Sequence, residues 1–330
     1  MAATPEKSSA AGHPARIIRE RGVLRLPPFV LCSGERLVGG ELAWQAWGAH
    51  QAPVAIVLGG ISAGRDIGTW WSTQCGPGRS LDPQRLRLVS IDWLGGADAS
   101  TGPRGDAAFP AIDTLDQAHA LLALLNHLGV ARVEVIVGAS YGGCVAQHLG
   151  VLLGSRLGRL VVIGAAHRAS PWALALRHLQ RAGIAAAGHD RAARGEALRR
   201  ARALAVLAYR TPDELEARFG EADAQTGVLG WLDAHGERFA RRFDTEAFLR
   251  LSASLDAHVC AVEAIVAPTT LVTFVEDLIV PPALVEACAR RIAGARLVAL
   301  NSRYGHDAFL KEVAAVAAVL DDVINTECPA

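Results

Sequence analysis

Short apolar runs alternate with longer amphipathic stretches along most of this chain. The runs are rich in Val, Ile and Leu, which is typical of strands buried on both faces. We expect such strands at residues 54–58, 86–91, 132–137, 160–163, 269–274 and 295–300. Helical spacing fills most of the intervals, and strands that alternate with helices predict an α/β fold with a mostly parallel sheet flanked by helices. Residues 30–32 and 41–47 are expected to form antiparallel edge strands.

The strand pattern stops between residues 170 and 260, where Ala, Arg, Leu and Glu recur at helical spacing. This stretch is predicted to be a helical lid inserted into the α/β core. The core would then comprise residues 21–169 and 261–330. It follows a polar N-terminal tail, residues 1–20, that is expected to be disordered.

The segment V-I-V-G-A-S-Y-G-G at residues 135–143 carries the first sign of chemistry. An apolar strand that ends in G-x-S-x-G and opens a helix is how an α/β-hydrolase fold presents a nucleophilic serine, here Ser140. A G-x-S-x-G alone is also compatible with a tight turn in a Gly-rich chain. The strand before Ser140 and the helical spacing after it favour the nucleophile.

A nucleophilic serine needs a base, and the base needs a carboxylate that fixes its tautomer. The strand expected at 269–274 runs into a loop with Glu276 and Asp277, either of which could be this carboxylate. His306 follows the last expected strand and is the predicted base. Taken alone, Asp277 could be a turn cap and His306 one of 11 histidines. The chain order Ser, acid, His is the order of this fold and favours the catalytic interpretation.

The oxyanion formed during acyl transfer needs two main-chain N–H donors. In this fold one follows the nucleophile and the other lies after an earlier core strand. We expect the N–H groups of Tyr141 and Ile61 to fill these roles, although the loop around Ile61 could also be a plain Gly-rich turn.

Composition narrows the choice of partners. Among the 330 residues, 33 basic side chains balance 33 acidic ones, so no net field attracts nucleic acid or an anionic membrane. The first 19 residues are polar and lack the apolar core of a signal peptide, and no apolar run reaches membrane-span length. We therefore expect a cytoplasmic protein without nucleic-acid or membrane partners. The six cysteines lack ligand spacing, so free thiols are expected rather than disulfides or a metal site.

Beyond these residues, the chain carries a further set of short motifs: W-W at 70–71, G-P-G at 76–78, L-G-G at 94–96, S-T-G-P at 100–103, Q-R at 180–181, Y-R-T-P at 209–212, R-R-F-D at 241–244, D-L-I-V-P-P at 277–282 and Y-G-H-D-A-F-L at 304–310. With these motifs the chain resembles the homoserine O-acyltransferases of the α/β-hydrolase type over roughly residues 40 to 320.

The resemblance implies a function and a set of site residues. Ser140, Asp277 and His306 would form the triad, Arg181 would pair with the homoserine carboxylate, and Asp307 would receive its amino group. Without the resemblance, Arg181 is also compatible with a solvated helix residue and Asp307 with a helix N-terminal acid. The family further implies small-molecule substrates, an acyl-CoA co-substrate, no bound cofactor, and a homodimer joined through lid helices.

Two departures from the family pattern leave the acyl group open between acetyl and succinyl. Residues 59–63 read G-G-I-S-A where the family usually has H-A-L-T-G, and Tyr141 replaces Met or Leu. Both positions are expected to line the acyl pocket. Arg65 could pair with the free carboxylate of a succinyl group or be an exposed loop residue. A serine esterase or thioesterase, and an acyltransferase that uses serine, are the alternatives.

Overall fold

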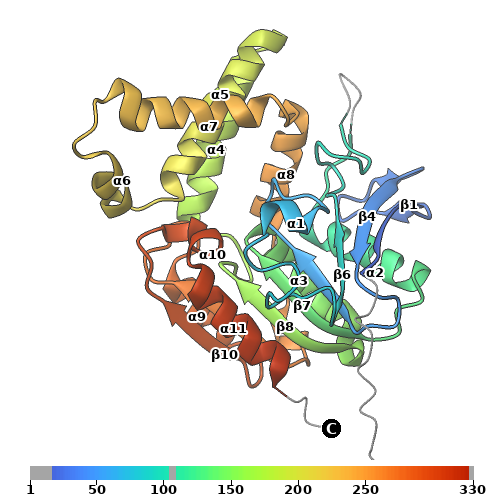
Figure 1. Cartoon of the computed structure of the whole chain (residues 1–330). Coiled ribbons are helices and arrows are strands. Elements are labelled where there is room, and N and C mark those ends of the chain that lie inside the picture. The colour runs from blue at the N-terminus through green and yellow to red at the C-terminus, as the bar shows by residue number, and fades with distance from the viewer. Residues whose placement is uncertain (1–16, 104–108, 327–330) are drawn as a thin grey trace, which may run out of the picture.

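An eight-stranded sheet forms the centre of the protein (Figure 1). The computed structural model describes residues 17–103 and 109–326. In sheet order the strands are β1 (Arg19–Arg25), β4 (Glu41–Trp47), β6 (Arg87–Ile91), β5 (Val54–Leu58), β7 (Val133–Ala139), β8 (Leu157–Ile163), β9 (Thr269–Phe274) and β10 (Arg296–Leu300). Neighbours from β6 to β10 are parallel, whereas β1 and β4 run antiparallel at one edge. The predicted mostly parallel sheet is confirmed.

The N-terminal strands differ from the sequence prediction. Strand β1 was missed because its residues alternate between exposed and half-buried, with charged side chains and no apolar run. The strand expected at 30–32 is instead β2 (Phe29–Val30), which pairs with β3 (Arg36–Leu37) in a separate two-stranded sheet. Of the expected tail, residues 1–16 lie outside the described residues, and Arg19 and Glu20 belong to β1.

Helices cover both faces of the sheet and also form the lid. The core helices are α1 (Ile67–Trp70), α2 (Thr114–His127), α3 (Tyr141–Leu153), α9 (Pro282–Ala289), α10 (Ala308–Lys311) and α11 (Val313–Asn325). Between β8 and β9 come α4 (Pro171–Ala186), α5 (Arg191–Ala208), α6 (Pro212–Phe219), α7 (Gly230–Ala240) and α8 (Thr245–Ala257). These five helices gather on one side of the molecule (Figure 1).

Local sequence explains where most lid helices begin. Ser170, Asp190, Thr211 and Asp244 each precede a helix and accept a hydrogen bond from a main-chain N–H in its first turn. Pro171 and Pro212 occupy the first helical position of α4 and α6, where the missing N–H has no cost. Four of the five lid helices are thus defined by caps within the sequence itself.

The strands supply two apolar layers, one on each face of the sheet. Along β7, Ile136 packs with helices α2 and α3, whereas Val135 and Val137 pack on the opposite side with α11. Because both faces are covered, all strand residues from β5 to β8 are buried apart from Glu134. The carboxyl ends of β7, β8, β9 and β10 meet at the edge beneath the lid, which is where open α/β sheets bind ligands.

Candidate active site

Ser140 occupies a strained turn between β7 and α3. Its φ is 54°, the only positive φ of a non-glycine residue in the described part of the chain. The turn is tight: a Cβ on Gly142 would lie 2.5 Å from the carbonyl carbon of Leu58, and one on Gly138 would lie 2.4 Å from Gly142 O. Glycine at these positions lets α3 pack against the neighbouring strand β5 and leaves the Ser140 hydroxyl at the carboxyl edge of the sheet.

The structure brings Ser140, His306 and Asp277 into one hydrogen-bonded chain. Ser140 Oγ lies 2.8 Å from His306 Nε2, and His306 Nδ1 lies 2.7 Å from Asp277 Oδ2. The other oxygen of Asp277 accepts N–H groups from Ile279 and Val280 at 2.8 and 3.0 Å. Because a carboxylate can only accept, His306 donates from Nδ1, and Nε2 is free to accept the Ser140 proton.

The choice between the two neighbouring carboxylates follows from these contacts. Glu276 turns the other way, and its Oε2 accepts the N–H of Ser302 at 2.7 Å. It therefore anchors the loop that leads to His306 rather than contacting the ring. Asp277 is almost fully buried beside the ring.

His306 is buried, yet its pKa is raised by the neighbouring Asp277. Burial alone would lower its pKa, but the charge and the hydrogen bond of Asp277 outweigh burial and raise the pKa above the usual value. Asp307 adds to the rise, whereas the cation of Arg177 opposes it. A base with a raised pKa suits proton transfer from a serine hydroxyl.

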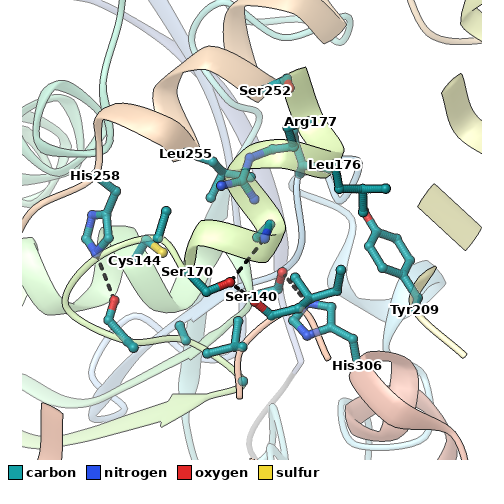
Figure 2. Close-up of a pocket in the computed structure, with 18 of the residues that line it drawn as sticks. Ser140, Cys144, Ser170, Leu176, Arg177, Tyr209, Ser252, Leu255, His258 and His306 are labelled. Carbon is teal, nitrogen blue, oxygen red and sulfur yellow. Dashed lines mark hydrogen bonds between the residues drawn. The ribbon is translucent and has the colours of Figure 1, made fainter. Parts of the chain in front are cut away.

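Two cavities meet at Ser140. Both are lined by Ile61, Ser140, Arg202, Tyr209 and His306. The first, here called the Arg177 cavity, continues between α4 and α8 to Arg177, Ser252, Leu255 and His258 (Figure 2). The second, the Asp307 cavity, continues along residues 60–63 to Trp70, Arg242, Asp307, Phe309 and Leu310. A group bound to Ser140 could therefore extend in one direction while another molecule approaches from the other.

The two residues expected to supply the oxyanion donors both lie near Ser140. Ile61 lines both cavities, and Tyr141 is the first residue of α3. The role of their N–H groups remains a prediction. The Tyr141 side chain does not line either cavity, contrary to expectation: its hydroxyl lies 3.0 Å from Ser254 Oγ and accepts from Gln117 Nε2 at 3.3 Å. The ring is fully buried against Trp93.

Arg181 is placed away from both cavities. Its guanidinium donates to Ser252 Oγ at 2.9 Å and to the Asp256 carboxylate. Arg177, one turn earlier on α4, donates to the other oxygen of Asp256 at 2.6 Å and lines the Arg177 cavity. Its Nη2 is buried without a hydrogen-bond partner among the described residues. Arg177 was not predicted, although its spacing of four residues from Arg181 places both on one helix face.

Arg65 likewise points away from the cavities. Its main-chain N–H and its guanidinium both contact Asp92, at 2.7 and 3.4 Å, and it lines neither cavity. Asp307 does line the Asp307 cavity, with Arg202 and Arg242. Arg202 was missed by the sequence analysis, although it lies seven residues, about two helical turns, before Tyr209 and so on the same face.

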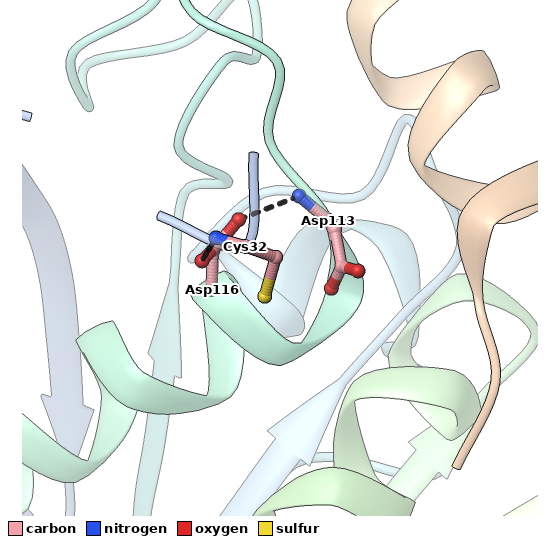
Figure 3. Close-up of side chains that lie close together, drawn as sticks. All are labelled: Cys32, Asp113 and Asp116. Atoms are coloured by element: carbon pink, nitrogen blue, oxygen red, sulfur yellow. Dashed lines mark hydrogen bonds between the residues drawn. The ribbon is translucent and has the colours of Figure 1, made fainter. Parts of the chain in front are cut away.

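A separate polar cluster at the start of α2 is a helix cap (Figure 3). Asp116 accepts N–H groups from Cys32 and Asp113, each at 2.9 Å, and Asp113 accepts the N–H of Leu115. Burial and the Asp116 charge raise the pKa of Cys32 to about 12, so its thiol stays protonated. The five cysteines in the described ranges are free, and Cys328 lies outside them.

Comparison with known proteins places these features in a family. The model of the alpha/beta hydrolase fold family matches residues 53–313. A homoserine O-succinyltransferase of Xanthomonas campestris pv. campestris is 37% identical over 327 residues, which cover 94% of this chain and 84% of the relative. A homoserine O-acetyltransferase of Thermus thermophilus is 36% identical over 274 residues, covering 76% and 71%.

Solved structures share the architecture. A homoserine O-acetyltransferase from Staphylococcus aureus superposes with a TM-score of 0.83 at 23% identity, covering 94% of this chain and 96% of that one. Esterase E22 superposes with a TM-score of 0.83 at 19% identity, covering 93% and 100%. At these identities the likeness concerns the fold alone. Within the described ranges, no helix has both the length and the apolar character needed to cross a membrane.

Proposed function

Because the chain belongs to the homoserine O-acyltransferase family of the α/β-hydrolase fold, we propose that it transfers an acyl group from acyl-CoA to the hydroxyl of L-homoserine. The observation that carries this proposal is the position of Ser140, where a cavity that ends in a cation meets one that holds a carboxylate beside the base. The Arg177 cavity could take the acyl chain, and the Asp307 cavity could take the charged head group of the amino-acid acceptor.

The first half-reaction acylates the serine. His306 takes the proton of Ser140 Oγ as this oxygen attacks the thioester carbonyl carbon, and the N–H groups of Ile61 and Tyr141 hold the oxyanion. The carbon–sulfur bond then breaks, His306 returns the proton to sulfur, and CoA leaves. Each step uses groups of this chain, with acyl-CoA as co-substrate and no resident cofactor.

The second half-reaction transfers the acyl group. Homoserine enters the side that CoA has left, its ammonium group pairs with Asp307, and its carboxylate pairs with Arg202. His306 removes the hydroxyl proton, the substrate oxygen attacks the acyl-serine carbonyl, and Ser140 leaves with the proton. The lid over both cavities keeps water from competing with the acceptor.

Arg202 replaces Arg181 as the proposed carboxylate ligand because of its surroundings. Its guanidinium lies over the rings of Tyr209 and Phe239, 5.8 and 4.9 Å from their centroids, and it lines both cavities. It forms no ion pair within the described residues. Arg181, by contrast, is already held by Asp256 and Ser252.

The donor that suits this site carries a carboxylate, as succinyl-CoA does. Arg177 and Arg181 share the single carboxylate of Asp256, so the group of three retains one positive charge. Arg177 lines the cavity, and its buried Nη2 has no hydrogen-bond partner among the described residues, so a carboxylate bound beside it would supply the missing acceptor. Arg168 also lines the cavity, but it is exposed and donates to Ala169 O.

Intact-protein mass spectrometry tests the proposal. The enzyme is mixed with succinyl-CoA or acetyl-CoA, with no acceptor, L-homoserine or L-serine, beside Ser140→Ala. We expect a succinyl adduct on the wild type alone, discharged by homoserine into O-succinylhomoserine. An adduct that water discharges as fast as homoserine would identify an esterase instead. If serine discharged the adduct faster than homoserine, serine would be identified as the acceptor.

The family and the lid surface support a cytoplasmic homodimer. A groove between α4 and α5 is lined mostly by small and apolar residues, with Gln180, Glu196 and Arg200 among them, and its Leu179 is 62% exposed. A second copy of this chain would cover such a surface. Light scattering of the wild type and of Leu179→Asp tests this, with a shift to the monomeric mass expected for the variant.

Free thiols and an acyl-CoA substrate both fit a reducing cell interior.

A further inference from the structure

The loop that carries His306 is fastened to the lid as well as to the core. Thr211 Oγ1 donates to Arg303 O at 2.5 Å, and the N–H of Asp307 donates to Tyr209 O at 3.4 Å. Gly305, with φ at 57°, is so close to the lid that a Cβ there would lie 2.8 Å from Tyr209 O. The lid segment from Tyr209 to Thr211 therefore packs directly on the residues that flank the base.

Arg210 forms the charged part of this contact. Its side chain is only 6% exposed and projects from the lid between two carboxylates. Nε donates to Asp307 Oδ2 at 3.0 Å, and Nη1 donates to Glu214 Oε1 at 3.4 Å. The rings of Trp231 and Tyr304 lie about 6 Å from the guanidinium and complete the enclosure. The guanidinium therefore has little freedom to move away from Asp307.

Arg210 is shared between two carboxylates. It pairs with Asp307 and with Glu214, and Glu214 also lies 3.9 Å from the partly exposed Arg218. Oδ2 of Asp307 is occupied by Arg210, whereas Oδ1 accepts no hydrogen bond from a residue in the described ranges. Asp307 lines the cavity beside His306, so the unoccupied oxygen is available to a cationic group there.

We propose that Arg210 is a positioning residue for the acceptor half of the reaction, holding one oxygen of Asp307 so that the other can bind the ammonium group of the amino acid. The inference rests on the proposed function. It assigns to the lid a part in building the acceptor site, beyond the exclusion of water. It also separates the two halves of the reaction, because acyl-CoA carries no ammonium group to pair with Asp307.

Kinetics of each half-reaction test this role. In Arg210→Gln, Asp307 loses its tether, and we expect the KM for L-homoserine to rise at least about tenfold, since hydrogen bonds between charged groups are of that strength. The rate of acyl-serine formation, measured without acceptor by mass spectrometry, should stay within about threefold of the wild type. Arg210→Lys keeps the charge without the planar fork and should give an intermediate KM.

Arg218 provides the matched control. It lies on α6, 3.9 Å from the same Glu214 carboxylate, but its side chain is 47% exposed and does not contact Asp307. Arg218→Gln should leave the KM for homoserine unchanged within about twofold. The inference is overturned if Arg210→Gln and Arg218→Gln have equal KM values, or if a folded Arg210→Lys loses acylation together with acceptor use. If the wild type forms the adduct and homoserine discharges it, but the KM for homoserine rises in neither Arg210 variant, the proposed function stands without this role for Arg210.

Discussion

Arg177 and Arg181, one turn apart on α4, donate to opposite oxygens of the Asp256 carboxylate, yet only Arg177 also lines the cavity that reaches Ser140. Two cations sharing one anion leave one positive charge, and Arg177, which carries part of it, lines the cavity that reaches Ser140. Under the proposed function, this charge would favour an acyl group that carries a carboxylate.

Donor preference should change when Arg177 is neutralised. In Arg177→Gln we expect kcat/KM for succinyl-CoA to fall about tenfold to a hundredfold, because a charged hydrogen bond to the substrate is lost. The value for acetyl-CoA should stay within about threefold. Arg181→Gln is the matched comparison: it removes the second cation on Asp256 but leaves Arg177 in the cavity, so the fall for succinyl-CoA should be smaller than in Arg177→Gln. An equal fall for both donors in Arg177→Gln would contradict the assignment.

Acylation should depend on pH through His306. The imidazole must be neutral to accept the Ser140 proton, and its pKa is raised by Asp277. The acylation rate should therefore rise with pH and reach half its plateau above pH 6.5, the usual value. The acylation rate is measured by following the release of CoA in a stopped-flow instrument. In Asp277→Asn the ring is held in the wrong tautomer, and the plateau should fall about 10⁴-fold. A midpoint below 6.5 in the wild type would contradict this account.

Stability should fall at acid pH because of His258. Burial lowers the pKa of His258 to about 3. Its Nε2–H donates to Ala166 O at 3.0 Å, so Nδ1 accepts from Thr114 Oγ1 at 2.8 Å, and the neutral ring fills both contacts. In the unfolded chain His258 binds a proton near pH 6.5, whereas in the folded chain it stays neutral until a much lower pH. The free energy of unfolding therefore declines as pH falls below 6.5. By pH 5 the loss should be about 2 kcal/mol.

Urea unfolding at pH 7, 6 and 5 measures this effect. The variant His258→Gln should be less stable than the wild type at pH 7 but should show a shallower decline with acid. If both proteins lost stability in parallel between pH 7 and 5, His258 would not be the group responsible.

The turn between β7 and α3 should tolerate no side chain at Gly142. A Cβ there meets the main chain of Leu58, which cannot move without disturbing β5. Gly142→Ala is expected to cost about 2 kcal/mol or more in the free energy of unfolding and to abolish acylation. Gly195, inside α5, has nothing within 4 Å of such a Cβ. Gly195→Ala should stabilise by up to about 1 kcal/mol. Urea midpoints and circular dichroism distinguish the two.

Several parts of the site were predictable because their signals are local. Ser140 lies among glycines that suit a sharp strand-to-helix turn, and His306 follows the last expected strand. The choice between Glu276 and Asp277 could not be made from spacing, because adjacent residues in a loop point in directions that the main chain alone determines. The structure shows Glu276 bound to Ser302 and Asp277 beside the ring.

Taken by itself, the sequence determined the alternation of strands and helices, the inserted lid pattern and the order of nucleophile, acid and base. Each of these depends on periodicity or on a local backbone requirement. Only the tertiary structure decided which arginines line the cavities that meet at Ser140. Arg177 and Arg181 differ by about 40° around α4. The partner that orients both, Asp256, is supplied by α8, more than 70 residues away in sequence. Long charged side chains take their direction from such distant partners, so their roles appear only when the helices are packed.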